Sequence, residues 1–256
     1  MGNVVAIARK ELRGYFASPV GWVILGLFAL LFGFFYYTFM VLFVRQSMQA
    51  GQFGMGPTSM NVNLYMIRPL LQNTSVIILF VLPMITMRTY AEEKRSGTIE
   101  LLLTSPVTDV QIILGKFLGA LGLYAAMLVV TMLYVGLLFR YGDPEVGPIA
   151  SGYLGLLLLG GGFIAVGLLV SSLTRNQIVA GMATFGTFLM LWVISWVGDF
   201  TGPTAGKIVS YLSITEHFDD FSKGIIDTKH IVYYLSFITF GLFLTAKAVD
   251  SERWRG

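Results

Sequence analysis

Long apolar runs, separated by short charged segments, dominate this chain of 256 residues. Six runs have uncharged cores close to the length of about 20 residues that a helix needs to cross the hydrocarbon of a bilayer. The pattern predicts an all-α integral membrane protein with a single transmembrane domain over residues 1–256. We expect six transmembrane helices at roughly residues 20–44, 70–90, 110–139, 148–174, 176–198 and 231–249.

The segment ahead of the first run is amphipathic. Val4, Ala8 and Leu12 fall on one side of a helix, and a second side carries the basic residues Arg9, Lys10 and Arg13. This spacing favours an N-terminal interfacial helix that lies along the membrane surface. A basic flank that only orients the first span is the simpler alternative.

The segment between the second and third runs, RTYAEEKRSGTIELLLTSP (residues 88–106), concentrates charge in an otherwise apolar region. Gly97 is a poor helix residue and Thr98 a good N-cap, so a new short helix is expected after the break. Glu100 would lie in its first turn, where the helix dipole favours an acid, and Pro106 would end it. Its apolar side chains, Leu101 and Leu102 among them, could dip into the bilayer surface or fit a groove on a partner protein.

Residues that commonly cap helices predict helix ends at two further places in the chain. Thr108 and Gln111 form a capping box that begins the third span near Asp109. Ser213 and Glu216 form a second possible box, and Gly224 is a suitable residue after a helix C-terminus. Short helices are therefore expected between the fifth and sixth spans.

Lysine and arginine are distributed unequally between the two sides of the predicted membrane domain. One side carries Arg9, Lys10, Arg13, Arg88, Lys94, Arg95, Lys116, Arg175, Lys247, Arg253 and Arg255, and the other carries Arg45, Arg68, Arg140, Lys207, Lys223 and Lys229. Because the more basic side faces the cytoplasm, both termini and residues 88–106 are predicted to be cytoplasmic. The short helices between spans five and six then lie outside.

Composition narrows the possible chemistry. The chain is 55% hydrophobic and 12% charged, and it has no cysteine. Thiol chemistry is excluded, and the net charge of +3 is too small and scattered to indicate nucleic acid. We expect no metal and no catalytic residue, although His217, Asp219 and Asp220 invite a metal hypothesis, and the methionines of residues 45–68 could bind Cu(I).

The sequence limits how transport by this chain could be powered. Their uncharged cores disfavour a proton- or ion-coupled transporter, which usually keeps titrating residues inside the membrane. The sequence has no Walker A motif, because the glycine–lysine pairs at 115–116 and 206–207 lack the full glycine spacing and the following Ser or Thr. The sequence contains neither an H-E-x-x-H nor a G-x-S-x-G motif, which disfavours a membrane-embedded enzyme.

Residues 88–120 resemble the signature of the type 2 ABC exporter permeases, in which an E-K-R-x-G-T-x-E-L-L-x-x-x-P stretch runs into a G-K pair at the head of the third span. The residues that match are Glu92, Glu93, Lys94, Arg95, Gly97, Thr98, Glu100, Leu101, Leu102, Pro106, Gly115 and Lys116. Residues 171–181 and 217–236 continue the likeness. Within this superfamily, the chain is similar to the GldF-type permeases associated with gliding motility.

The resemblance implies a half-transporter that pairs with a second permease copy, or a related membrane subunit, above two copies of a separate ABC ATPase. Residues 92–106 would form the coupling helix seated in the ATPase, and Arg9, Lys10, Glu11 and Arg13 of the N-terminal helix would lie close to it. ATP and Mg²⁺ would bind the ATPase, so this chain would carry no cofactor. The expected location is the bacterial inner membrane.

Two functions remain open at this point. The chain could serve an exporter of unidentified substrate, driven by ATP hydrolysis in its partner. It could instead belong to a mechanical or signalling complex that acts on an accessory envelope protein and carries no substrate.

Overall fold

A computed structural model describes residues 2–52, 60–98, 107–200, 211 and 213–253, and the regular structure within these ranges is helical. The elements are α1 (Gly2–Ala17), α2 (Pro19–Gln52), the π-helix η1 (Asn63–Ile67), α3 (Arg68–Thr86), α4 (Ala91–Ser96), α6 (Asp109–Tyr141), α7 (Val146–Ser172), α8 (Gln177–Phe200), α10 (Glu216–Ser222) and α11 (Thr228–Arg253). Six stretches of helix are long and apolar enough to cross a membrane. The prediction of an all-helical chain with six such helices is confirmed.

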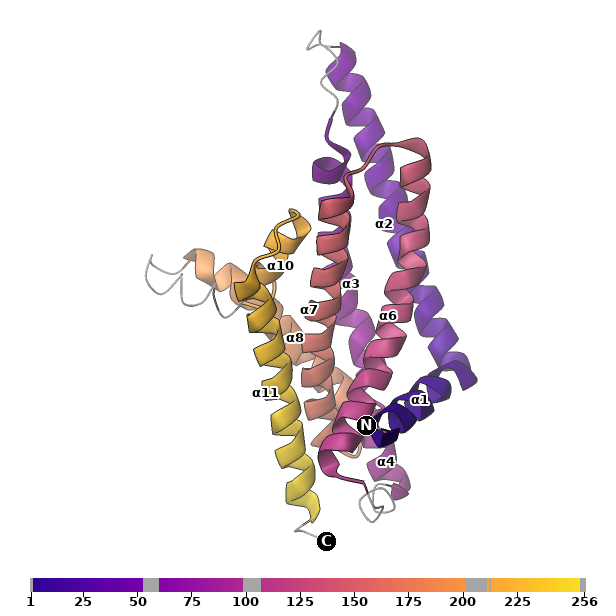
Figure 1. Cartoon of the computed structure of the whole chain (residues 1–256), viewed down its shortest axis with the longest axis vertical. Helices are drawn as coiled ribbons and strands as arrows, with labels where there is room; N and C mark the ends of the chain where they lie inside the picture. The colour runs from indigo at the N-terminus through magenta and orange to yellow at the C-terminus, as the bar shows by residue number, and fades with distance from the viewer. Residues whose placement is uncertain (1, 53–59, 99–106, 201–210, 212, 254–256) are drawn as a thin grey trace.

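The long helices form an elongated bundle around α7, which packs against α3, α6, α8, α10 and α11 (Figure 1). Figure 1 places α1, α4 and the C-terminal part of α11 at one end of the bundle, here called the α1 end. The opposite end carries η1, α10 and the beginnings of α7 and α11, and is called the α10 end. Helix α2 projects beyond the other helices at that side in Figure 1.

Small residues allow the neighbours of α7 to approach it closely. A Cβ on Gly160 would lie 2.2 Å from the ring of Tyr124, and one on Gly167 would lie 2.3 Å from the Thr86 hydroxyl oxygen. The Tyr124 hydroxyl also donates to the Leu156 carbonyl at 2.8 Å. Close packing of small residues is a main source of helix association in membranes, so these glycines position α3 and α6 on α7.

The chain turns sharply between α1 and α2. Gly21 lies so close to the Tyr15 carbonyl that a Cβ there would be 2.1 Å from its oxygen. The Trp22 indole nitrogen donates to the Phe16 carbonyl at 3.0 Å, which satisfies a group at the C-terminal end of α1. This corner sets the angle at which α1 leaves the bundle.

The second span is interrupted where the sequence suggested one helix over residues 70–90. Helix α3 ends at Thr86, three residues beyond Pro83, and residues 87–90 form a turn before α4 begins. Proline has no N–H to donate within a helix, and the turn is stabilised by Ser171 of α7, as described below. The break expected at Gly97 is present, because this residue ends α4 with a φ of 73°, in the left-handed region.

Several helix ends follow the capping signals. Thr108 and Gln111 form the expected reciprocal box at the start of α6. At α10, the Glu216 N–H donates to the Ser213 hydroxyl at 3.4 Å, although Thr215 is the residue that directly precedes the helix. Gly224 follows α10 with a φ of 93°. Helix α2 continues to Gln52, about two turns past the end expected near residue 44.

Candidate functional site

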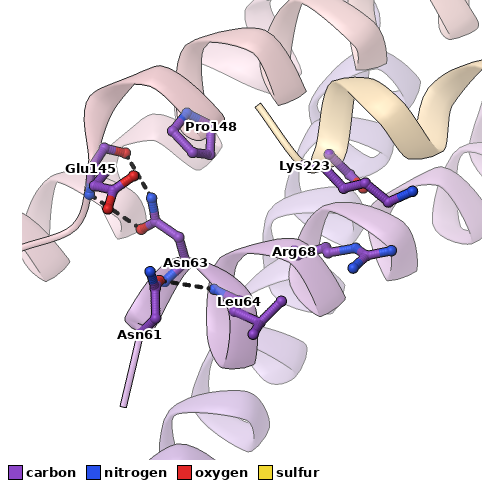
Figure 2. Close-up of a pocket in the computed structure, with 8 residues that line it drawn as sticks. Asn61, Asn63, Leu64, Arg68, Glu145, Pro148 and Lys223 are labelled. Atoms are coloured by element: carbon purple, nitrogen blue, oxygen red, sulfur yellow. Dashed lines mark hydrogen bonds between the residues drawn. The ribbon is translucent and has the colours of Figure 1, made fainter. Parts of the chain in front are cut away.

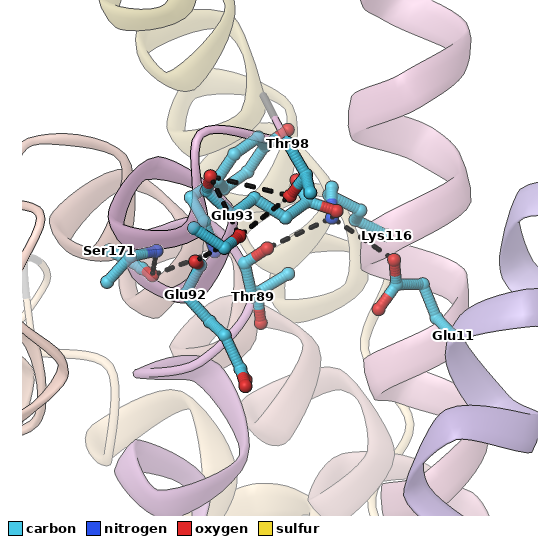
Figure 3. A network of polar contacts seen from close by, with 10 residues as sticks. Glu11, Thr89, Glu92, Glu93, Thr98, Lys116 and Ser171 are labelled. Carbon is cyan, nitrogen blue, oxygen red and sulfur yellow. Dashed lines mark hydrogen bonds and ion pairs between the residues drawn. The ribbon is translucent and has the colours of Figure 1, made fainter. Parts of the chain in front are cut away.

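A buried lysine joins three elements at the α1 end. Lys116, near the start of α6, is 1% exposed, and its ammonium group contacts Glu11 of α1 at 3.1 Å and Glu93 of α4 at 2.7 Å. It also donates to the Thr89 carbonyl at 2.9 Å, in the turn that precedes α4 (Figure 3). One side chain therefore fixes α1, α4 and α6 relative to one another.

The charges of this lysine cluster, defined as Lys116, Glu11 and Glu93, hold one another in place. Both carboxylates have side chains that are 17% exposed, so little water reaches them. The Tyr90 ring lies 5.1 Å from the ammonium nitrogen, a distance at which an aromatic face attracts a cation. Removing one member would leave an opposite charge buried without its partner, which is strongly unfavourable.

Helix α7 fastens the turn between α3 and α4 through Ser171. The Ser171 hydroxyl accepts hydrogen bonds from the N–H groups of Tyr90 and Ala91, each at 3.1 Å, and donates to the Met87 carbonyl at 3.1 Å. The buried ammonium group of Lys94 donates to the Ser172 carbonyl next to it. Because buried backbone groups need partners, these contacts make the end of α7 part of the same structural unit as α4.

Helix α1 is seated on α6 along a row of glycines. A Cβ on Gly115 would lie 2.6 Å from Ile7, and one on Gly119 would lie 2.6 Å from the Cβ of Glu11. Gly122 faces Leu12 at a looser 3.4 Å. Gly115 and Gly119, which form a G-x-x-x-G pattern at the head of α6, therefore receive the N-terminal helix.

The side chains predicted to contact an ATPase separate into two groups in the structure. Lys94, Glu93 and Glu11 point into the protein and make the internal contacts described above. The side chains that remain exposed are Arg9, Lys10, Arg13, Glu92 and Arg95, together with Gly97 and Thr98. Glu100, Leu101, Leu102 and Pro106 lie outside the described residues.

Three polar contacts order α4 and the residues on either side of it. The Arg88 guanidinium donates to the Glu92 carboxylate at 3.0 Å, one helical turn away. The Thr98 hydroxyl lies 2.9 Å from that of Ser96 and donates to the Glu93 carbonyl at 3.4 Å (Figure 3). The exposed part of α4 is thus held as a short, ordered helix ahead of residue 99.

Sequence reasoning missed how central Lys116 and Ser171 are. Lys116 was matched only as part of a signature, and Ser171 was not distinguished from its neighbours. The available signal was the position of Lys116, two turns into a helix whose adjoining residues are apolar. A cation at such a place requires carboxylate partners, and Glu11 and Glu93 are the acidic residues that α1 and α4 bring to it.

An apolar groove lies between α3 and α8, in the half of these helices nearer the α1 end. It has a volume of about 360 Å³ and is lined by Phe80, Pro83, Met84, Met87, Ile178, Gly181, Met182 and Phe185. The rings of Phe80 and Phe185 lie 5.1 Å apart across it. Methionine and aromatic side chains adapt to apolar ligands of different shapes, so the groove suits an apolar or amphiphilic molecule.

A smaller polar pocket of about 230 Å³ lies at the α10 end (Figure 2). Asn63 exchanges hydrogen bonds with the backbone of Glu145, donating at 3.0 Å and accepting at 3.2 Å, and so joins η1 to the start of α7. On its other side, Arg68 contacts Asp219 of α10 at 3.0 Å, and Lys223 lies beside the same carboxylate. The pocket is bordered by contacts that fix α10 against α3 and α7.

Among the residues that the structure describes, no group of three or more His, Asp or Glu is arranged to hold a metal ion. His217, Asp219 and Asp220 are not brought together around one point. Asp219 contacts Arg68, Asp220 contacts His230, and His217 contacts His230 on its other side.

The fold and the lysine cluster define a membrane subunit whose α1 end is built as one rigid unit from three segments. The chain belongs to the ABC-2 family of transporter proteins, which it matches over residues 5–249. It is 30% identical over 146 residues to the probable multidrug ABC transporter permease YbhR of Escherichia coli (strain K12) and to its counterpart in Escherichia coli O157:H7. These alignments cover 55% of this chain and 38% of each relative.

Family membership fixes the general role. The chain is a multi-pass membrane protein of the ABC-2 transporter family, and its role is that of a membrane permease.

Proposed function

We propose that this chain is half of an ABC exporter in a bacterial inner membrane, with both termini and the α1 end in the cytoplasm. Two copies of a separate ATPase would bind ATP and Mg²⁺ and drive the conformational change. A second copy of this chain, or a related permease, would complete the membrane domain. The observation that carries the proposal is the lysine cluster, because it links two segments at the ATPase-facing end directly to α6.

The exposed side chains at that end supply a contact surface for the ATPase. Arg9, Lys10 and Arg13 on α1 and Glu92 and Arg95 on α4 offer charges of both signs, which favour one orientation of a partner. Residues 92–106, which include Glu100, Leu101, Leu102 and Pro106, would form the coupling helix in the ATPase cleft. A push on this helix reaches α6 through Glu93 and Lys116, and α7 through Lys94.

The apolar groove between α3 and α8 supports an apolar or amphiphilic substrate. Its lining is largely methionine and phenylalanine, and it opens at the surface of the chain, where Ile178 and Met182 are exposed. The name of the Escherichia coli relative describes a probable multidrug permease, and we propose the same broad substrate class here.

A second candidate is a mechanical or signalling complex of the GldF type that acts on an accessory envelope protein. The resemblance of residues 88–120 to such permeases favours it. So does the length of α2, which continues about two turns past the predicted span and projects at the α10 end (Figure 1). Such an extension offers a surface for an envelope partner.

Reconstitution with the cognate ATPase tests both functions. In vesicles, an exporter should move a lipophilic dye in one direction and show ATPase stimulation by that dye. Stimulation by an envelope protein, with no dye movement, would support the second candidate.

A charge reversal tests the ATPase contact. Glu100→Lys should release or uncouple the ATPase while the chain remains folded in the membrane. The matched control is Asp143→Lys, at an exposed position after α6. Unchanged ATPase binding and stimulation in the Glu100 variant would contradict its assignment to the coupling helix.

A further inference from the structure

The two histidines of the chain meet at the α10 end and are almost completely buried. His217 of α10 is 4% exposed and His230, in the first turn of α11, is 5% exposed. Their Nδ1 atoms lie 2.6 Å apart, within hydrogen-bond distance. His217 Nε2 lies 3.0 Å from the Tyr211 carbonyl oxygen, and His230 Nε2 lies 2.8 Å from a carboxylate oxygen of Asp220.

The partners of the two outer nitrogens determine how many protons the rings hold. A carbonyl oxygen and a carboxylate oxygen only accept hydrogen bonds, so each Nε2 must carry a hydrogen. A neutral imidazole carries only one N–H. With both rings neutral, the two Nδ1 lone pairs would therefore face each other at 2.6 Å, which is repulsive.

One additional proton on the pair removes this repulsion between the two Nδ1 lone pairs. Placed on either Nδ1, it lets that nitrogen donate to the other, and every polar atom in the row is then satisfied. The two rings together carry one positive charge, which the Asp220 carboxylate balances. A shift of the protons along the row toward Asp220 leaves their number, and the net charge of the trio, unchanged.

We propose that His217, His230 and Asp220 form a proton-binding site that holds one shared proton between the two imidazoles and thereby links α10 to α11. The site is distinct from the lysine cluster and does not depend on the proposed export function. Its ligand is a proton, and its occupancy determines whether the Nδ1–Nδ1 hydrogen bond between α10 and α11 is made.

The surroundings of the pair favour a single charge over two. The Tyr233 ring stacks on His217 with centroids 3.8 Å apart, and an aromatic face stabilises a cation. Burial, the largest effect, lowers the pKa of His217 below its ordinary value, with His230 and Lys229 acting in the same direction. Burial and the neighbouring charges therefore oppose a second proton on the pair, whereas the facing Nδ1 atoms require the first.

Other charged and titratable groups face the pair from the elements packed around it. They are Asp219 and Lys223 of α10, Lys229 and Tyr234 of α11, Asp227 just before α11, Arg68 of α3, and Tyr211. Lys229 and the N-terminus of α11 oppose a positive charge on His230. Asp220, in direct contact at 2.8 Å, is the acid closest to it.

The site should be occupied only within a window of pH. Loss of the shared proton at high pH leaves two lone pairs in contact. Uptake of a second proton at low pH places two N–H groups in contact. Either change breaks the Nδ1–Nδ1 hydrogen bond, so the two histidines are hydrogen-bonded to each other only between the two titrations.

Nitrogen NMR of the full chain tests the proposal directly, because His217 and His230 are its only histidines. The chain would be labelled with ¹⁵N-histidine, purified with a tag free of histidine, and reconstituted in lipid. We expect both Nε2 atoms and one shared Nδ1 position to be protonated near neutral pH. We also expect the two rings to titrate in two separate steps, as coupled groups do.

Two variants test whether the Asp220 carboxylate stabilises the shared proton. Asp220→Asn keeps an acceptor but removes the charge, and should weaken binding of the shared proton by about tenfold or more, since a carboxylate in contact shifts a pKa by about 1–3 units. Asp227→Asn keeps the contact of this residue with the Lys229 backbone and should change proton binding far less.

Three results would overturn the proposal. Both Nδ1 atoms could be unprotonated near neutral pH, or both rings could titrate together in one step. The spectrum could also change on addition of a chelator or of Zn²⁺, which would show that a metal ion rather than a proton lies between the rings.

Discussion

At the scale of single residues, Lys116 explains why charged residues are tolerated at the head of a membrane helix. A lone buried cation would be costly, but Glu11 and Glu93 approach it from two other elements at 3.1 and 2.7 Å. Lys116 and the carboxylates on α1 and α4 therefore stabilise one another as buried charges.

Replacing this lysine should be strongly destabilising. Lys116→Met leaves two carboxylates without their partner, and the free energy of unfolding should fall by about 3–5 kcal/mol. Thermal unfolding in detergent measures the change. The matched control is Lys10→Met, at an exposed position of α1, which should have an effect within about 0.5 kcal/mol.

Neutralising the acids at the same time should restore much of the loss. In a triple variant with Lys116→Met, Glu11→Gln and Glu93→Gln, no buried charge in the lysine cluster lacks a partner, and such replacements are often close to neutral. If Lys116→Met alone were as stable as Lys10→Met, the ion pairs would not hold the α1 end together.

At the scale of elements, α1 behaves as a part of the bundle as well as a surface helix. Its inner side rests on the glycines of α6, and Glu11 enters the lysine cluster, while Arg9, Lys10 and Arg13 remain exposed. The position of α1 is thus set by van der Waals contact and by one ion pair.

Gly119→Ala should displace α1, since the added Cβ would lie 2.6 Å from that of Glu11. A cysteine at Ile7, next to Gly115, reports the displacement through faster reaction with a water-soluble maleimide. Gly136→Ala, also on α6 but with no atom within 4 Å of the new Cβ, is the control and should leave the rate unchanged. Equal rates in the two variants would mean that the glycine row does not seat α1.

Helix α10 should become less firmly held in acid. Burial alone would raise the pKa of Asp219, but hydrogen bonds from Lys223 and Arg68 outweigh it and hold this pKa below its ordinary value. Because the pKa is lower in the folded state, the stabilisation is complete above the unfolded pKa of about 3.9 and is lost as the pH falls through the folded pKa.

Asp219→Asn removes this acid-sensitive contribution. The variant should be less stable than the native chain at neutral pH, and the difference should shrink as the pH falls below about 3.9, the ordinary pKa of aspartate. Thermal unfolding as a function of pH measures it, with Asp143→Asn as the exposed control. A difference that stays constant with pH would contradict the assignment.

The sequence predicted the elements far better than their contacts. Apolar runs located the long helices because a membrane span needs a continuous apolar length, and Thr108 with Gln111 located the start of α6 because capping is local. The turn at residues 87–90 was not foreseen, since it depends on Ser171, which is some 80 positions away along the chain. The pairing of His217 with His230 likewise depends on how α10 packs against α11.

At the scale of the whole molecule, contacts between distant segments gather at the two ends of the bundle. The lysine cluster and Ser171 join α1, α4, α6 and α7 at one end, and the histidine pair with the Arg68–Asp219 contact fixes α10 at the other. The middle of the bundle consists largely of apolar side chains and glycines. Such a distribution suits a machine in which force applied at one end is carried along rigid helices.

The orientation of the molecule can be tested by labelling, because the chain has no cysteine of its own. Single cysteines at Ser96 and Lys229, both exposed positions, should react from opposite sides of the membrane. A membrane-impermeant maleimide added to whole cells should label the Lys229 position and leave the Ser96 position unlabelled until the cells are opened. The reverse pattern would invert the proposed topology.

The central claim is that the ATPase drives the spans through the lysine cluster. It is tested most directly in vesicles that contain the cognate ATPase and either the native chain or the triple variant of Lys116, Glu11 and Glu93. We predict that the variant still binds the ATPase, but that ATP-driven dye transport falls at least about tenfold, a loss of about 1.4 kcal/mol in coupling. Transport by the triple variant at the native rate would contradict the claim.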